Sequence, residues 1–254
     1  MLALDPDAIH WNLPEQARRG RPLLVLLHGR GSDEHDLVGL TMALPPGFAI
    51  ASVRAPIAEG FGWSWFDPEE GGPSGNPHPE HADLAADAVL EWLHRLEWVP
   101  PHVGALGFSQ GGAMAVHLMR RDPYRFDFAV NLAGFVVRGE QLADAALAVR
   151  RPHVFWGLGS DDPLFTPEVL RRTETWLPRH STLTTAHYPG LGHSISPDEL
   201  RDVAVFLQER LDFRAAAPTH IEPPTHPTKP LRTNDNVDRY SPIFVTDPPR
   251  TMGE

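Results

Sequence analysis

The chain has 254 residues, with 22 lysines and arginines against 33 aspartates and glutamates, and no cysteine. The resulting net charge of −11 argues against nucleic acid or anionic lipid as a partner, because both carry negative charge. Without cysteine the chain has no disulfide framework and no thiolate chemistry, which suits a cytoplasmic enzyme.

The N-terminal segment lacks the basic stretch and apolar run of a signal peptide, and no segment reaches the roughly 18 apolar residues of a membrane span. We therefore expect neither a secretion signal nor stable membrane insertion. An apolar run over residues 21–28 ends at a glycine-rich segment and predicts a buried parallel strand. The sequence DLVGLTMALPP predicts a short helix that its two prolines end, and residues 48–53 predict the next strand.

Residues 54–80 form a long segment rich in proline and glycine that carries large aromatic residues, among them Trp63, Trp65 and Phe66. An irregular loop of this length inside a compact domain usually has a function. An amphipathic helix is predicted over residues 81–97, because apolar residues recur there at helical spacing.

Strands and helices alternate along the rest of the domain. Further strands are predicted over residues 102–109, 127–134, 153–159 and 182–188, with helices directly after the first, from Thr166 to about Trp176, and from Ser196 to Leu211. The final helix begins with Ser196-Pro197-Asp198-Glu199, the pattern of a capping box with proline at the first helical position. The alternation predicts an α/β fold with a mostly parallel central sheet, helices on both faces and no large lid.

The composition changes near residue 214. Residues 1–213 predict one α/β domain, which is long enough to fold without a disulfide or a structural metal. Residues 214–254 are rich in proline and poor in large apolar residues, so we expect an extended or disordered tail outside the domain.

A candidate nucleophile lies between a predicted strand and a predicted helix, where Gly107-Phe108-Ser109-Gln110-Gly111 matches G-x-S-x-G. The serine of this motif occupies a tight turn, which small residues two positions away on either side permit. The turn lifts the hydroxyl to the carboxyl edge of the sheet and places the next N–H at the start of a helix. Ser109 is therefore the expected nucleophile, and the backbone N–H of Gln110 is an expected donor to an oxyanion.

A serine nucleophile needs a base beside it, and the base needs a carboxylate that orients it. His193 lies after the last predicted strand in a loop with flanking glycines, which lets its imidazole reach back to Ser109. The acid is expected after the strand over residues 153–159, where Asp161 and Asp162 are adjacent and at least one suits an ordinary turn. A second oxyanion donor is expected in the loop over residues 27–34.

The order of motifs resembles the phospholipase/carboxylesterase family, which includes acyl-protein thioesterases and small bacterial carboxylesterases. The segments that carry the resemblance are LLHGRGSDEHDL, RAP, GWSWFD, GFSQGG, DDPLF and GLGHSIS, and they span about residues 7–211. The resemblance implies an α/β-hydrolase fold that cleaves carboxylic esters or thioesters without a cofactor.

Residue by residue, the resemblance implies a triad of Ser109, Asp162 and His193. It assigns the second oxyanion donor to the backbone N–H of Arg30, beside that of Gln110. It also places the WFD segment near the pocket, so we expect Trp65 and Phe66 to bind substrate.

These observations favour a serine carboxylesterase of short to medium acyl esters, with an acyl thioesterase or a lysophospholipase as alternatives that use the same acyl chemistry. A metal-dependent hydrolase is a weaker alternative, suggested by His78 and His81 in one loop, where a third ligand is missing. A non-catalytic binding module is weaker still, because every catalytic residue type is present. We expect a small-molecule substrate, no metal and, as an open alternative to a monomer, a homodimer.

Overall fold

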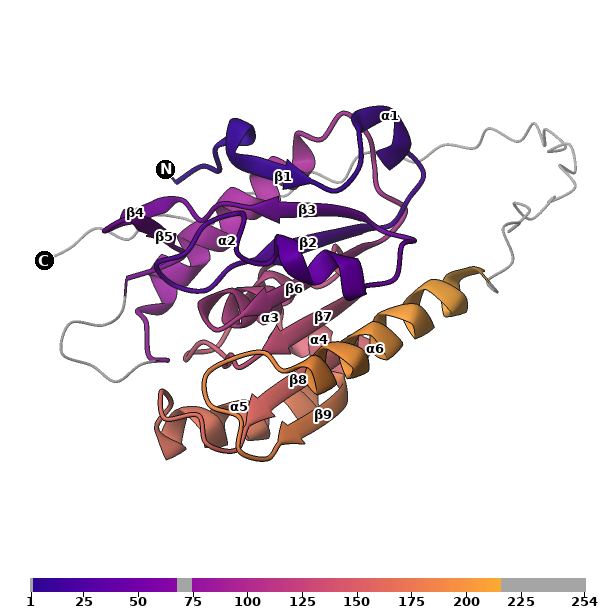
Figure 1. Ribbon diagram of the computed structural model, residues 1–254. Helices are drawn as coiled ribbons and strands as arrows, with labels where there is room; N and C mark the ends of the chain where they lie inside the picture. The colour runs from indigo at the N-terminus through magenta and orange to yellow at the C-terminus, as the bar shows by residue number, and fades with distance from the viewer. Residues whose placement is uncertain (1, 68–74, 216–254) are drawn as a thin grey trace, which may run out of the picture. The chain divides into compact units, whose positions relative to one another are not determined.

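The computed structural model of the protein describes residues 2–67 and 75–215. In this part of the chain seven strands form one sheet in the order β1-β3-β2-β6-β7-β8-β9 (Figure 1). The strands are β1 (Ile9–Trp11), β2 (Leu23–Leu27), β3 (Ala49–Val53), β6 (Val103–Phe108), β7 (Phe128–Leu132), β8 (His153–Gly159) and β9 (Thr182–Tyr188). Edge strand β1 is antiparallel to β3, and every other neighbouring pair is parallel. The predicted mostly parallel α/β sheet is confirmed.

Helices cover both faces of this sheet. They are α1 (Glu15–Arg18), α2 (Pro79–His94), α3 (Gln110–Arg121), α4 (Asp144–Arg150), α5 (Pro167–His180) and α6 (Pro197–Ala215), with 3-10 helices η1 (Pro6–Ala8) and η2 (Val38–Ala43). Apolar residues of α2, α3, α4 and α5 pack on one face, and those of α6 pack with residues flanking η2 on the other.

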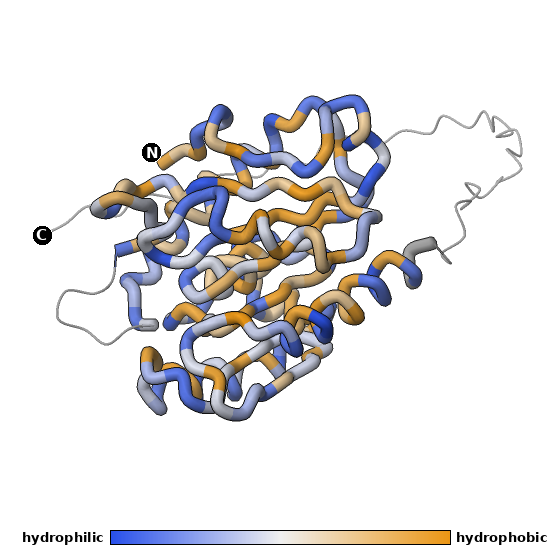
Figure 2. Tube along the Cα trace, viewed as in Figure 1, coloured by the Kyte–Doolittle hydropathy of each residue, from blue (hydrophilic) through white to orange (hydrophobic). Residues whose placement is uncertain are grey.

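The alternation of side chains along strand β2 shows why two cores form. Leu23, Val25 and Leu27 belong to the core beneath α2 and α3, whereas Leu24 and Leu26 belong to the core beneath α6. Both sets are fully buried, so the strand reads as a continuous apolar run. The apolar colouring in Figure 2 is accordingly concentrated along the central strands.

The segment predicted as one irregular loop contains regular structure. Strands β4 (Ile57–Glu59) and β5 (Gly62–Ser64) pair as an antiparallel hairpin, and α2 begins at Pro79. The helix expected before Pro45 is the short 3-10 helix η2. Strand β1 and helix α4 were not predicted, because elements of three to seven residues carry too few apolar repeats to show a period.

The predicted capping box at the start of α6 forms only in half. Ser196 Oγ accepts a hydrogen bond from the backbone N–H of Glu199 at 3.1 Å. The Glu199 carboxylate does not reach back to the cap; it is buried, and both oxygens lack a hydrogen-bond partner. Helix α6 continues to Ala215, and the rest of the expected tail lies outside the described residues, so the division at residue 213 stays a prediction. In the described part of the chain, no helix has the length and apolar character needed to span a bilayer.

Candidate active site

The candidate residues meet at the carboxyl edge of the parallel sheet. Ser109 follows β6, Asp162 follows β8, His193 follows β9, and Arg30 follows β2. Because parallel strands point the same way, the loops after them gather at one edge, where open α/β sheets bind ligands. The topology therefore brings residues from positions 30 to 193 to a single site.

Ser109 occupies a strained turn between β6 and α3. Its backbone has φ 57° and ψ −116°, a conformation that residues with a side chain rarely adopt. Close packing explains the two flanking glycines, since a Cβ on Gly107 would lie 2.0 Å from the carbonyl oxygen of Gly111, and a Cβ on Gly111 would lie 1.9 Å from that of Leu27. The motif is thus required by backbone contacts as well as by the turn.

Hydrogen bonds join Ser109, His193 and Asp162 into one chain. Ser109 Oγ donates to His193 Nε2 at 2.8 Å, and His193 Nδ1 donates to Asp162 Oδ2 at 2.7 Å. The side chain of Asp162 is 3% exposed and that of His193 is 18% exposed. Solvent therefore has little access to the carboxylate, which strengthens its interaction with the imidazole.

Of the two adjacent aspartates, the structure directs only Asp162 at the imidazole. Its second oxygen, Oδ1, accepts a hydrogen bond from the N–H of Leu164 at 3.0 Å, so the carboxylate also closes an Asx-turn. Asp161 is exposed, and its Oδ1 accepts a hydrogen bond from Ser160 Oγ at 2.8 Å. Its N–H donates to the carbonyl of Leu191 at 3.0 Å, which ties the acid loop to the histidine loop.

Two aromatic rings pack against the imidazole of His193. The ring centroid of Phe108 lies 4.9 Å away and that of Phe165 lies 5.7 Å away. Because both rings pack against the imidazole, they limit its rotation while Nδ1 and Nε2 hold their hydrogen bonds.

The expected oxyanion donors are the backbone N–H groups of Arg30 and Gln110. Neither N–H has an acceptor within the part of the chain that is described, and Gln110 is the first residue of α3, where a free N–H is normal. The β4–β5 hairpin holds the Arg30 loop, because Gly31 N–H donates to the carbonyl of Trp63 and Trp63 N–H donates to that of Ser32, both at 2.8 Å.

The Arg30 side chain binds Glu59 on β4 through Nε and Nη2. The hydrogen bond from Arg30 holds the pKa of the Glu59 carboxyl below its usual range, and Ser64 Oγ donates to the same carboxylate. Because Glu59 pairs with the guanidinium, the Arg30 side chain brings no unpaired positive charge to the site, and the role of its backbone N–H stays a prediction.

His28 supports the same loop and was not singled out from the sequence. Its Nδ1 donates to the carbonyl of Gly29 at 2.7 Å, and its Nε2 accepts from Ala55 N–H at 3.0 Å. Burial lowers the pKa of His28, which keeps the ring neutral and able to fill both roles. The sequence gave no signal for this role, because the second partner, Ala55, follows a different strand.

Trp65 and Phe66 occupy different positions, although both were expected to bind substrate. Trp65 is 0% exposed, its indole Nε1 donates to the carbonyl of His28 at 2.9 Å, and it is absent from the cavity lining. Phe66 lines the cavity. Trp65 thus lies in the core beneath the loop that carries Arg30, where its indole N–H has a buried partner, and its contact with substrate stays a prediction.

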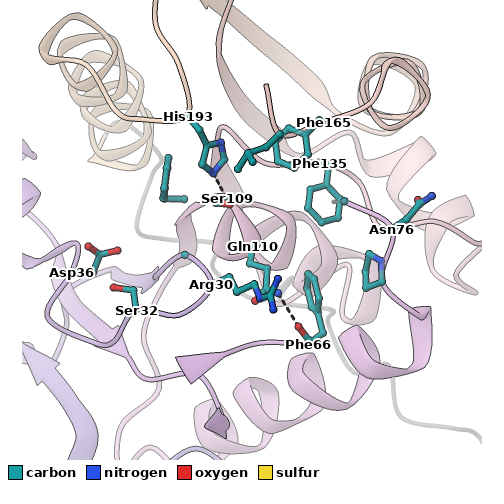
Figure 3. A pocket seen from close by; sticks show the side chains of 15 residues that line it. Arg30, Ser32, Asp36, Phe66, Asn76, Ser109, Gln110, Phe135, Phe165 and His193 are labelled. Atoms are coloured by element: carbon teal, nitrogen blue, oxygen red, sulfur yellow. Dashed lines mark hydrogen bonds between the residues drawn. The ribbon is translucent and has the colours of Figure 1, made fainter. Parts of the chain in front are cut away.

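A cavity of about 450 Å³ opens at Ser109 and His193. Its lining beyond those two residues comprises Gly29, Arg30, Ser32, Asp36, Phe66, Gly75, Asn76, Pro77, Phe108, Gln110, Phe135, Leu164 and Phe165. Figure 3 shows Ser32 and Asp36 on one side of Ser109, and Phe135, Phe165 and Asn76 on the other. The cavity thus has a polar end and an aromatic end, with the candidate nucleophile between them.

The histidine pair considered as a metal site lies at the start of α2. The rings of His78 and His81 face each other with centroids 5.5 Å apart. Among the described residues, the group in which three ligand atoms converge is instead Asp33, Glu34 and His35. Arg54 binds the Glu34 carboxylate there at 2.6 Å through both Nε and Nη2.

Comparison with known proteins identifies the family of the chain. The sequence pattern that defines the phospholipase/carboxylesterase family matches residues 12–211. The chain belongs to the phospholipase/carboxylesterase family. The resemblance inferred from its motifs is confirmed, and membership places the chain among esterase-type hydrolases.

The chain matches different shares of the relatives to which it is similar. Carboxylesterase SOBER1 from Arabidopsis thaliana is 28% identical over 155 residues, which are 58% of this chain and 68% of that protein. The protein NocK of Nocardia uniformis subsp. tsuyamanensis is 36% identical over 126 residues, 48% of this chain but only 34% of its own length. The crystal structure of the Bacillus cereus carboxylesterase matches with a TM-score of 0.67 at 22% identity, over 79% of this chain and 93% of that one. At that identity the structural likeness supports the α/β-hydrolase fold.

Proposed function

We propose that the protein is a serine carboxylesterase that hydrolyses short to medium acyl esters through an acyl-enzyme. The observation that carries the proposal is the pair of hydrogen bonds at His193, 2.8 Å to Ser109 Oγ and 2.7 Å to Asp162 Oδ2, at the mouth of a partly aromatic cavity. Nucleophile, base and orienting acid are then all within hydrogen-bond reach of one another, as acyl transfer requires.

In the first half of the reaction, Ser109 Oγ attacks the ester carbonyl carbon while its proton moves to His193 Nε2. The carbonyl oxygen becomes an oxyanion, to which the N–H groups of Arg30 and Gln110 donate. Collapse of this intermediate breaks the bond to the alcohol oxygen, which leaves with the proton from His193. In the second half, water gives its proton to His193, attacks the acyl group and releases the carboxylic acid as Ser109 recovers its proton.

The cavity dimensions support a modest acyl group, because about 450 Å³ lies in the lower part of the range for small-molecule pockets. The same steps cleave a thioester or the remaining acyl ester of a lysophospholipid, so these substrates stay as alternatives. A cytoplasmic location and a homodimer also stay predictions.

The test combines active-site labelling with a substrate panel. Wild-type protein is expected to react with a fluorophosphonate probe and to hydrolyse p-nitrophenyl esters from acetate to laurate, with activity unaffected by EDTA. Ser109→Ala is expected to lose labelling and about 10⁶-fold in kcat while keeping the melting temperature at or above that of wild type. Full turnover by folded Ser109→Ala protein, or inhibition by EDTA, would refute the mechanism.

A further inference from the structure

The aromatic end of the cavity is built from segments that are far apart in sequence. Gly75, Asn76 and Pro77 form one part of its wall, and Phe135 forms another. The ring centroids of Phe135 and Phe165 lie 5.4 Å apart, so Phe165 closes the wall beside His193. Nothing in the regular sheet fixes the first segment, since it lies outside every strand.

Arg172, on α5, forms hydrogen bonds with both wall segments without lining the cavity itself. Its Nη1 donates to Asn76 Oδ1 at 2.7 Å and its Nη2 donates to the carbonyl of Gly75 at 2.7 Å. Its Nε donates to the carbonyl of Val136, next to Phe135, at 2.8 Å. The planar guanidinium therefore bridges both segments at once, which a single flexible amine cannot reproduce.

The acceptors of Arg172 are unusual for a half-buried cation. All three are neutral oxygens, two from the lining residues Gly75 and Asn76 and one from Val136, and the Glu168 carboxylate on the same helix acts on the guanidinium electrostatically. Burial accordingly lowers the pKa of Arg172, which still remains charged. The hydrogen bonds of the guanidinium that the described residues show thus go to the two wall segments.

Neighbouring residues of α5 make the same junction tight. Thr173 Oγ1 accepts a hydrogen bond from Val136 N–H at 3.0 Å. Gly75 has φ +87°, and a Cβ there would lie 2.7 Å from a methyl group of Val169 and 3.2 Å from the Phe165 ring. Helix α5 thus contacts both wall segments, so the position of these segments depends on the position of α5.

We propose that Arg172 is a positioning residue that sets the width of the aromatic end of the cavity and so determines which acyl groups the site accepts. This inference rests on the proposed esterase function. The apolar end suits the acyl chain, and the end with Ser32 and Asp36 suits the departing alcohol. Arg172 itself does not line the cavity, so it acts through the wall and not by touching substrate.

The experiment measures kcat and KM for p-nitrophenyl acetate, butyrate and hexanoate in wild type, Arg172→Met and Arg172→Lys. In Arg172→Met we expect the ratio of kcat/KM for hexanoate over acetate to change by about ten-fold, equivalent to about 1.4 kcal/mol, mainly through KM. Arg172→Lys is expected to recover only part of the ratio. Arg171→Met is the matched control, because Arg171 is the exposed neighbour on the same helix, and it should retain the wild-type ratio.

Two further measurements keep the test decisive. A series of esters with one acyl group and varied alcohols should give the same relative kcat/KM values in Arg172→Met and wild type. Asn76→Ala removes the acceptor for Nη1 and should shift the acyl ratio in the same direction as Arg172→Met, and in the double variant the two shifts should not add.

An acyl ratio that stays unchanged in folded Arg172→Met or in folded Asn76→Ala, shifts that add in the double variant, or a changed dependence on the alcohol would overturn the inference. A wild-type protein without Ser109-dependent hydrolysis would instead overturn the proposed function, so the two failures are distinguishable.

Discussion

Gln110 holds the backbone of Trp65. The side-chain oxygen of Gln110 accepts a hydrogen bond from Trp65 N–H at 2.9 Å, and its amide Nε2 donates to the carbonyl of Phe66 at 2.8 Å. The side chain of Gln110 thus fixes the backbone at Trp65 and Phe66, and Phe66 lines the cavity. The backbone N–H of Gln110 is itself an expected donor to the oxyanion.

Gln110→Ala should lower stability and activity together. The substitution keeps the backbone N–H of residue 110 but leaves two buried backbone groups without partners, each worth about 1–3 kcal/mol. We expect the free energy of unfolding, measured in urea, to fall by about 2–4 kcal/mol, and kcat/KM to fall as Phe66 loses its fixed position. Gln110→Glu keeps the acceptor for Trp65 N–H, so its free energy of unfolding should lie between those of wild type and Gln110→Ala. Wild-type stability of Gln110→Ala would show that these bonds are dispensable.

Asp162→Asn should be far more damaging than Asp161→Asn. The amide at 162 favours the wrong histidine tautomer, a change that can cost about 10⁴-fold in kcat in a triad enzyme. Asp161 faces solvent, so its substitution should change kcat only a few-fold. Steady-state kinetics of both folded variants on one ester decide the matter, and the reverse ranking would assign the orienting role to Asp161.

Trp65→Ala and Phe66→Ala should separate stability from selectivity. Removal of the fully buried Trp65 leaves a large cavity, so we expect about 3–5 kcal/mol of lost stability. Phe66 lines the pocket, and Phe66→Ala should shift acyl-chain preference with a smaller loss of stability. Thermal unfolding and the p-nitrophenyl ester panel measure the two effects. A selectivity change confined to Trp65→Ala would restore the sequence expectation for that residue.

Glu199 should make stability fall as the pH rises. Burial raises the pKa of its carboxyl from 4.5 to about 7, and nearby Asp202 adds to the effect. Because the folded state holds a proton that the unfolded state has released, the stabilisation is complete below about pH 4.5 and is lost as the pH rises to about 7. The loss amounts to at most roughly 3 kcal/mol.

Glu199→Gln cannot ionise and isolates this effect. The difference in unfolding free energy between wild type and Glu199→Gln, measured in urea from pH 4.5 to 8, should grow with pH and then level off. A difference that is constant across this range would mean that Glu199 does not titrate within it.

Asp36 should favour a cationic departing group. It lines the polar end of the cavity, where Glu59 already neutralises Arg30. We expect thioacetates of a trimethylammonium thiol to be preferred over those of a carboxylate thiol, and Asp36→Asn to reduce the preference about five-fold, as roughly 1 kcal/mol for an exposed charge pair implies. Asp33→Asn, outside the lining, is the control, and high salt should weaken the preference. Equal preference in wild type and Asp36→Asn would contradict this.

The position of the candidate site followed from the sequence because local patterns determine it. The G-x-S-x-G motif, the loop with His193 and the Asp-Pro pair at 162 each follow a predicted strand, and parallel topology brings the ends of such strands together. The structure places these three side chains in hydrogen-bond contact, as the motifs led us to expect.

Other features were beyond sequence reasoning because they depend on packing between distant segments. The side chain of Gln110 meets Trp65 across 45 positions, and Arg172 meets Gly75 across 97. Trp65 looked like a loop residue because its neighbours are polar and glycine-rich, yet the indole fills a space beneath His28 that no periodicity reveals.

The backbone of Ser109 has a wider consequence for how this chain tolerates change. A residue held at φ 57° and ψ −116° destabilises the fold by about 1–3 kcal/mol, and glycine would relieve that strain while abolishing the nucleophile. Thermostability and turnover are therefore opposed at this one position. Selection for stability alone, in a laboratory or in a lineage that no longer needs the reaction, would favour loss of the serine and give an inactive protein with the same fold.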